Sequence, residues 1–143
     1  MKQTATAPRN FAEKIQVAEA WLQDRAPGFT EVTKTSDYAL WFFNHSILGS
    51  GMLELIDNAE LSQGGAVVAL SAQLMVTPPQ TLEEALDVLR LNDWPCGCTI
   101  VLKDLVGIDD LMIEGKFPLE ELSCARIDKL LRVLTDGKHY LES

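Results

Sequence analysis

The sequence Tyr38-Ala-Leu-Trp-Phe-Phe43 places the first constraint on the fold. Its aromatic and aliphatic residues favour a short β-strand. Because successive side chains of a strand point to opposite faces of a sheet, Leu40 and Phe42 share one face and the odd-numbered residues share the other. Both faces are therefore apolar. A sheet covered by helices on one face would leave the second apolar face to be buried in another way.

Turn residues separate further strand-like segments on both sides of this stretch. Gly49-Ser-Gly51 follows it as an expected turn, and residues 107–110 form another between two later segments. Short apolar segments at hairpin spacing predict an antiparallel meander. The expected strands are residues 29–35, 38–43, 52–56, 66–76, 99–103 and 111–117.

Three segments have the end signals and the apolar spacing of helices. Each begins at a residue whose side-chain oxygen can accept a hydrogen bond from the first turn, namely Asn10, Thr81 or Ser123. A glutamate three residues after Asn10, and another three residues after Thr81, complete capping boxes. The expected stops are Pro27-Gly28, Asn92-Asp93 and Gly137.

These elements predict an α+β fold. We expect an antiparallel sheet with helices packed on one face, in the order α-β-β-β-α-β-β-α. Residues 10–143 are expected to form this single domain, because a chain of 143 residues suits one hydrophobic core. Residues 1–9 are polar and are expected to be a flexible N-terminal arm.

The composition limits the class of partner. The chain has 12 Lys and Arg residues against 21 Asp and Glu residues, which gives a formal net charge of −9. Because such a surface repels phosphate groups, we expect neither a nucleic acid nor a membrane as partner. The N-terminal residues lack the apolar segment of a secretory signal, and the chain has three cysteines. Both features predict a cytoplasmic protein.

Groups that could carry chemistry are few and scattered. His45 and His139 lie outside any nucleophile motif, and Cys96-Gly-Cys98 differs from the Cys-x-x-Cys spacing of redox sites. A metal or catalytic site built from Cys96, Cys98 and His139 is the least favoured hypothesis, since nothing in the sequence brings these residues together. We therefore expect no enzyme activity, no catalytic residue, no metal and no cofactor.

Several local patterns resemble the class I type III secretion chaperones, which serve single effectors. Residues 67–74 (Val-Val-Ala-Leu-Ser-Ala-Gln-Leu), followed by Pro78-Pro79, resemble the third strand of the family and its proline exit. Leu86-Asp-Val-Leu-Arg-Leu-Asn92 resembles the second helix, although Asp93-Trp-Pro95 follows where the family often carries leucine and an aromatic residue. Leu111-Met-Ile-Glu-Gly-Lys-Phe-Pro-Leu119 resembles the last strand before the C-terminal helix. The resemblance covers most of the chain.

This resemblance implies a non-enzymatic homodimer that binds the extended N-terminal segment of a secreted effector. Apolar side chains of that segment would enter apolar patches, and the acidic surface would attract basic segments. The fold also allows an alternative, a non-secretion adaptor or assembly factor similar to the YbjN-like proteins, which would bind a cytoplasmic protein.

Ten residues follow from the resemblance as candidate contacts, and each of them could instead belong to the core. The candidate partner-binding residues are Phe11, Ile15, Leu22, Leu40 and Phe42. The candidate dimer-interface residues are Leu86, Leu89, Trp94, Ile100 and Leu102.

Overall fold

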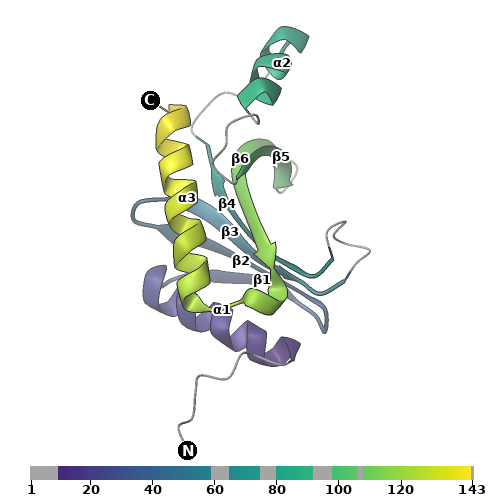
Figure 1. The fold of residues 1–143 in the computed structure, drawn as a ribbon, viewed down its shortest axis with the longest axis vertical. Helices are drawn as coiled ribbons and strands as arrows, with labels where there is room; N and C mark the ends of the chain where they lie inside the picture. Colours follow the sequence, from purple (N-terminus) through teal and green to yellow (C-terminus); the bar gives the residue numbers. More distant parts are fainter. Residues whose placement is uncertain (1–9, 59–64, 75–79, 92–97, 106–107, 143) are drawn as a thin grey trace, which may run out of the picture.

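The computed structural model describes residues 10–58, 65–74, 80–91, 98–105 and 108–142, and Figure 1 shows their arrangement. The helices are α1 (Phe11–Arg25), α2 (Leu82–Leu91) and α3 (Cys124–Glu142), with a short 3-10 helix, η1 (Leu119–Glu121), before α3. The strands are β1 (Thr30–Lys34), β2 (Tyr38–His45), β3 (Gly49–Ile56), β4 (Val67–Gln73), β5 (Thr99–Leu105) and β6 (Ile108–Pro118).

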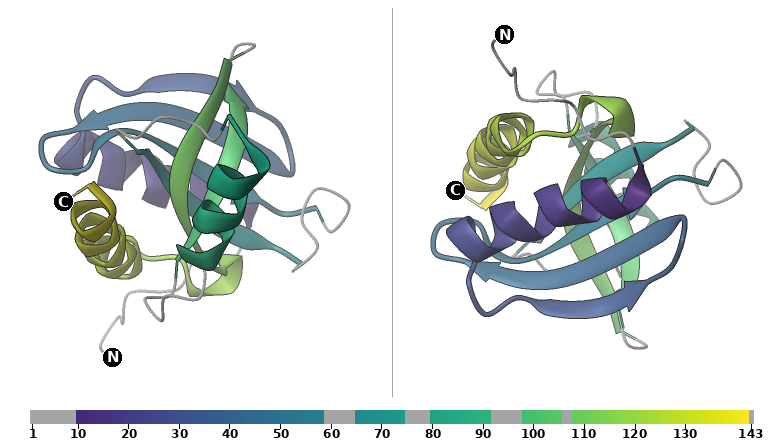
Figure 2. Two further views of the ribbon diagram at one scale, coloured as in Figure 1. Left: turned by 90° about the horizontal axis from the view of Figure 1, so that it is seen from above. Right: turned by 90° about the horizontal axis from the view of Figure 1, so that it is seen from below.

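The strands form one antiparallel sheet with the order β1-β2-β3-β4-β6-β5. The predicted α+β class is confirmed. Four strands precede α2, in agreement with the expected strand ranges, whereas the expected element order had only three. The sheet is strongly twisted, so that β5 and β6 cross the direction of β1 and β2 in Figure 2.

The predicted helix starts are confirmed by hydrogen bonds at all three caps. The backbone N–H of Glu13 donates to the Asn10 side chain at 2.8 Å, and that of Glu84 donates to Thr81 Oγ1 at 3.1 Å. The backbone N–H of Arg126 donates to Ser123 Oγ at 3.0 Å. Local sequence signals therefore place these helix ends correctly.

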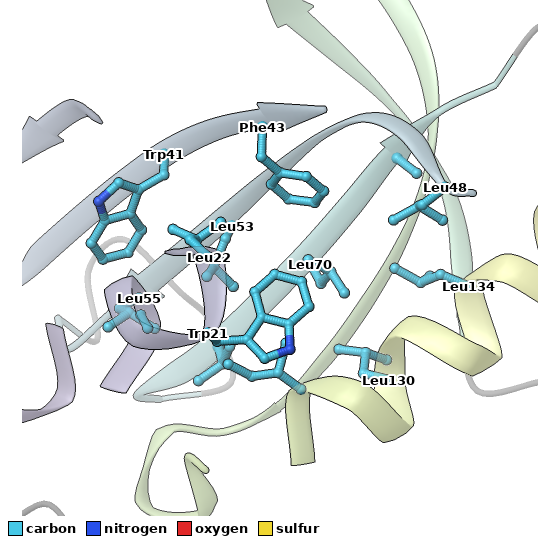
Figure 3. Packing of buried hydrophobic residues seen from close by; sticks show 14 of the residues in the cluster. Trp21, Leu22, Trp41, Phe43, Leu48, Leu53, Leu55, Leu70, Leu130 and Leu134 are labelled. Atoms are coloured by element: carbon cyan, nitrogen blue, oxygen red, sulfur yellow. The ribbon is translucent and has the colours of Figure 1, made fainter. Parts of the chain in front are cut away.

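Helices α1 and α3 pack against one another and against the same face of the sheet (Figures 1 and 2). Trp41, Leu53 and Leu70 occupy opposed positions on β2, β3 and β4, and all three are fully buried in the core under these helices. Trp21 of α1 packs edge-on against Phe43 of β2, with the ring centroids 6.0 Å apart (Figure 3). This contact positions α1 over the first strands of the sheet.

Several predicted boundaries are wrong. One is the turn expected at residues 107–110, because β6 already begins at Ile108 and pairs with β5 from there. Gly49-Ser-Gly51 belongs to β3, and the turn before it is formed by residues 46–48, because Gly49 begins the strand with a φ of +83° that glycine adopts readily. Helix α3 also continues past Gly137 to Glu142. Gly137 is buried, and Leu141 continues the apolar face of the helix onto the core, so packing outweighs the poor helix propensity of glycine.

Candidate partner-binding surface

The sheet has a second face, opposite to the face that α1 and α3 cover. Between β2 and β3, Leu40 lies opposite Glu54 and Phe42 lies opposite Met52. Across the next strands, Met52 lies opposite Ser71 of β4, and Ser71 lies opposite Glu114 of β6. We call this surface the second face. Its apolar side chains include those of Tyr38, Leu40, Phe42, Met52, Ile56, Val67, Ala69, Val101 and Met112, and its polar side chains include Glu54, Ser71 and Glu114.

Exposure varies across the second face. Tyr38, Leu40 and Phe42 on β2 are half-buried, whereas Met52 and Met112 are buried. None of these five belongs to the core cluster under α1 and α3. The apolar character of both faces of β2, which the sequence predicts, is therefore present in the structure, and part of the second face reaches solvent.

A hollow of about 190 Å³ opens at one end of the second face. Its lining residues are Phe42, Phe43, Ser50, Gly51, Met52, Gln73 and Met112. The absence of a side chain at Gly51, which is one of the lining residues, leaves room for the Phe43 ring, because an added Cβ would lie 2.7 Å from Cζ of Phe43 and 2.6 Å from the carbonyl oxygen of Ser71. Methionine walls adapt to ligands of different shape, because the thioether side chain is unbranched and flexible.

Polar groups on the second face are held in defined positions. The Tyr38 hydroxyl donates to Glu54 Oε2 at 2.7 Å, and the Ser71 hydroxyl donates to Glu114 Oε2 at 3.2 Å. Lys116 Nζ lies 3.6 Å from Glu114 Oε1. Burial, together with the hydrogen bond to Glu54 and the charge of that carboxylate, raises the pKa of the Tyr38 phenol above its usual value. The second face thus combines an apolar hollow with carboxylates that hydrogen bonds hold in defined positions.

Helix α2 carries a separate apolar surface. Leu82 and Leu86 lie one turn apart on its exposed side, and their exposed fractions are 77% and 43%. The helix contacts β5 and lies at the opposite end of the molecule from α1 (Figure 1). Leu82 and Leu86 thus form a small exposed apolar patch on the described part of α2.

The five candidate partner-binding residues do not form one surface. Ile15 and Leu22 lie in the core under α1, with exposed fractions of 8% and 0%, and Phe11 packs against the same core. Leu40 and Phe42 lie on the second face instead. The prediction that Ile15 and Leu22 face a partner is therefore wrong, because α1 uses this apolar side to cover the sheet.

The candidate dimer-interface residues are only partly described. Leu86 is exposed on α2, and Ile100 of β5 is partly buried against the core. The side chains of Leu89 and Leu102, and the whole of Trp94, lie outside the described residues. The contribution of all five residues, Leu86, Leu89, Trp94, Ile100 and Leu102, to a dimer stays a prediction.

Sequence reasoning missed the methionines of the hollow. Met52 and Met112 are 60 positions apart in the chain and share one face only because β4 pairs with both β3 and β6. The period-two pattern along each strand could have placed each methionine on a face. It could not have predicted which strands are neighbours.

The groups considered for chemistry are dispersed in the described part of the structure. Cys98 is buried and Cys124 is exposed, while Cys96 lies outside the described residues. Across residues 10–58, 65–74, 80–91, 98–105 and 108–142, no three His, Cys, Asp or Glu side chains are close enough to hold a metal ion. Within the same ranges, none of the helices has the length and apolar character that crossing a membrane requires.

Comparisons with known proteins identify the fold but no family. No family model matches the chain, and no curated protein matches it significantly. Among solved structures, the chain is similar to an uncharacterized protein from Methanothermobacter thermautotrophicus, with a TM-score of 0.58 and 12% identity. That alignment covers 89% of this chain and 92% of the other. At this identity the likeness concerns the fold alone.

Proposed function

We propose that this protein is a non-enzymatic cytoplasmic chaperone that works as a homodimer and binds an extended apolar segment of another protein on its second face. The resemblance to type III secretion chaperones suggests the N-terminal segment of a secreted effector as the partner. The alternative is an adaptor or assembly factor that binds a cytoplasmic protein without secretion.

The observation that carries this proposal is the solvent-accessible apolar part of the second face. Leu40 and Phe42 are half-buried beside a hollow whose walls are mainly apolar. An extended segment can place alternate side chains against such a sheet face, and one side chain of leucine or phenylalanine size suits the hollow. The apolar contact offsets the entropy that the segment loses on binding.

The homodimer rests on α2. Leu82 and Leu86 are exposed in the single chain, and a second copy of α2 would bury them together with β5. A stable dimer of this kind buries more than about 1,000 Å² in total. Self-association through α2 would leave the second-face residues Leu40 and Phe42 available to the partner.

The net charge indicates what kind of segment binds. The chain carries a formal charge of −9, and Glu54 and Glu114 lie on the second face. A segment that combines apolar with basic residues would be attracted by this field, whereas an acidic segment would be repelled.

The direct test is recovery of the partner from the native host. We expect tagged wild-type protein to retain a specific protein, and Leu40→Asp to retain at least roughly tenfold less, because the new carboxylate would have to be desolvated against apolar groups. The matched control is Tyr140→Asp, which places the same charge on an exposed aromatic position of α3, the helix that covers the other face. Equal recovery with both variants would contradict the proposal.

Two further readouts separate the alternatives. Circular dichroism of Leu40→Asp distinguishes loss of binding from loss of fold, and an unfolded variant would mean that Leu40 belongs to the interior. A secreted effector encoded beside this gene would support the secretion chaperone, whereas a resident cytoplasmic protein among the recovered partners would support the adaptor.

A further inference from the structure

The β2–β3 turn is capped by the side chain of a histidine. His45 is the last residue of β2, and residues 46–48 form the turn before β3 begins at Gly49. His45 Nδ1 accepts two hydrogen bonds from backbone N–H groups, those of Ile47 and Leu48, and each N···Nδ1 distance is 3.1 Å. One imidazole nitrogen therefore satisfies two donors of the turn, in the manner of Asn and Asp side chains that cap turns.

This arrangement requires an unprotonated Nδ1. An imidazole nitrogen that carries a proton is a donor and cannot accept a hydrogen bond. In the imidazolium form both ring nitrogens are donors, so the N–H groups of Ile47 and Leu48 would face a third N–H and a positive charge. Protonation would therefore replace two attractive contacts with two repulsive ones.

The surroundings of His45 oppose protonation. Burial lowers the pKa of His45 below its usual value, and the Arg25 guanidinium of α1 lowers it further. The carboxylate of Asp128 on α3 acts in the opposite direction. Arg25 and Asp128 are the charged groups that face the ring from the two helices, and their net effect together with burial keeps the imidazole neutral near pH 7.

We propose that His45 is a pH-sensitive cap of the β2–β3 turn, which closes the turn while the imidazole is neutral and releases it when Nδ1 takes a proton. The turn carries Leu48, which is fully buried in the core cluster that also holds Leu134 of α3 (Figure 3). Release of the turn therefore loosens a core contact and not only a surface loop.

The cap also lies close to the hollow on the second face. In the β2–β3 hairpin the pair His45 and Gly49 is followed by Asn44 with Ser50 and then by Phe43 with Gly51. Ser50, Phe43 and Gly51 all line the hollow. If the hollow binds a partner, which rests on the proposed function, acidification would weaken partner binding through this turn.

The sign of the pH dependence follows from the direction of the shift. Because the pKa of His45 is lower in the folded state than in the unfolded chain, the folded state binds fewer protons. The contribution of the cap to stability is therefore present above the unfolded pKa of about 6.5 and is lost as the pH falls through the folded pKa.

The experiment needs no partner, so its failure is separate from failure of the proposed function. NMR titration of the chain, which has only His45 and His139, would give the pKa of each imidazole. Hydrogen exchange of the Ile47 and Leu48 amides would be measured from about pH 7.5 to about pH 5, expressed as protection factors to remove the intrinsic pH dependence of exchange. We expect the protection of both amides to fall by roughly tenfold, the factor that corresponds to one net hydrogen bond.

Two variants complete the test. His45→Asn offers a side-chain oxygen that accepts a turn N–H at every pH, so the protection of the two amides should no longer change with pH. His139→Asn removes the exposed histidine of α3 and should behave as wild type. A His45 pKa at or above 6.5, or the same loss of protection in His45→Asn as in wild type, would overturn the proposal.

Discussion

Arg25 of α1 and Asp128 of α3 form a two-pronged ion pair across the junction of the two helices. Arg25 Nε lies 3.1 Å from Asp128 Oδ1, and Nη2 lies 3.0 Å from Oδ2. The indole N–H of buried Trp21 donates to the same Oδ1 at 2.8 Å. Asp128 therefore joins a surface ion pair to a core tryptophan, and it holds together the two helices that cover the sheet.

Replacing Asp128 should destabilise the fold mainly through Trp21. Asp128→Ala leaves the buried indole N–H without its acceptor, which costs about 1–3 kcal/mol, whereas an exposed ion pair adds only about 0–1 kcal/mol. Asp128→Asn keeps an oxygen for Trp21 and should cost less than Asp128→Ala. Urea unfolding measures both changes. Asp24→Ala is the control, because Asp24 also pairs with Arg25 but is largely exposed. Similar losses in all three variants would contradict this account.

The stabilisation of the fold by Asp128 should decrease at low pH. The hydrogen bond from Arg25, with smaller effects of Trp21 and neighbouring charges, holds the pKa of Asp128 below its usual value despite partial burial. The ion pair therefore stabilises the fold above the unfolded pKa of about 3.9 and is lost as the pH falls through the lower folded pKa. The difference in unfolding free energy between wild type and Asp128→Asn should shrink below about pH 4. A difference that stays constant down to pH 2 would show that charge plays no part.

Gly51 should tolerate no side chain. Its added Cβ would lie 2.6 Å from the backbone carbonyl oxygen of Ser71 and 2.7 Å from the Phe43 ring, so the strands or the ring must move. We expect Gly51→Ala to lower the unfolding free energy by about 1–3 kcal/mol, as overpacked interiors do. Gly115→Ala is the comparison, because its Cβ would meet only the side chain of Leu130, which can change rotamer. A smaller loss at Gly51 than at Gly115 would be inconsistent with the packing.

The phenol of Tyr38 should ionise at a higher pH than the phenol of an exposed tyrosine. Burial is the main cause that raises the pKa of its phenol, followed by the hydrogen bond to Glu54 and the charge of that carboxylate. Since the folded pKa exceeds the unfolded value of about 10, this stabilisation is present below pH 10 and is lost as the pH rises through the folded pKa. The chain has two tyrosines, so the ultraviolet difference between wild type and Tyr38→Phe isolates Tyr38. Ionisation of Tyr38 at or below pH 10 would contradict its half-buried position and its hydrogen bond to Glu54.

Self-association should depend on α2. Leu86→Asp places a charge on the exposed apolar side of the helix and should convert a micromolar dimer into monomer, with unchanged circular dichroism. Val32→Asp is a matched control, because Val32 on β1 is 46% exposed and Leu86 is 43% exposed. Light scattering measures both. A wild-type protein that is only monomeric at micromolar concentration would contradict the homodimer.

The elements of this protein were largely predictable because their signals are local. Asn10, Thr81 and Ser123 cap the helices at the predicted residues, since a cap depends on atoms within one turn. The alternation in β2 correctly separated Leu40 and Phe42 from Trp41. The end of α3 was missed because Gly137 is a helix stop in isolation, but here it is buried and the helix packs beyond it.

The location of the exposed apolar surface was settled by packing between distant segments. Ile15 and Leu22 have the same helical spacing as residues of a binding surface, and they are buried only because α1 lies across the sheet. Met52 and Met112 share the hollow through the pairing of β3, β4 and β6. Side-chain pattern alone tells which residues share a face, whereas strand order and helix placement determine which face meets water, because burial depends on contacts between residues far apart in the chain.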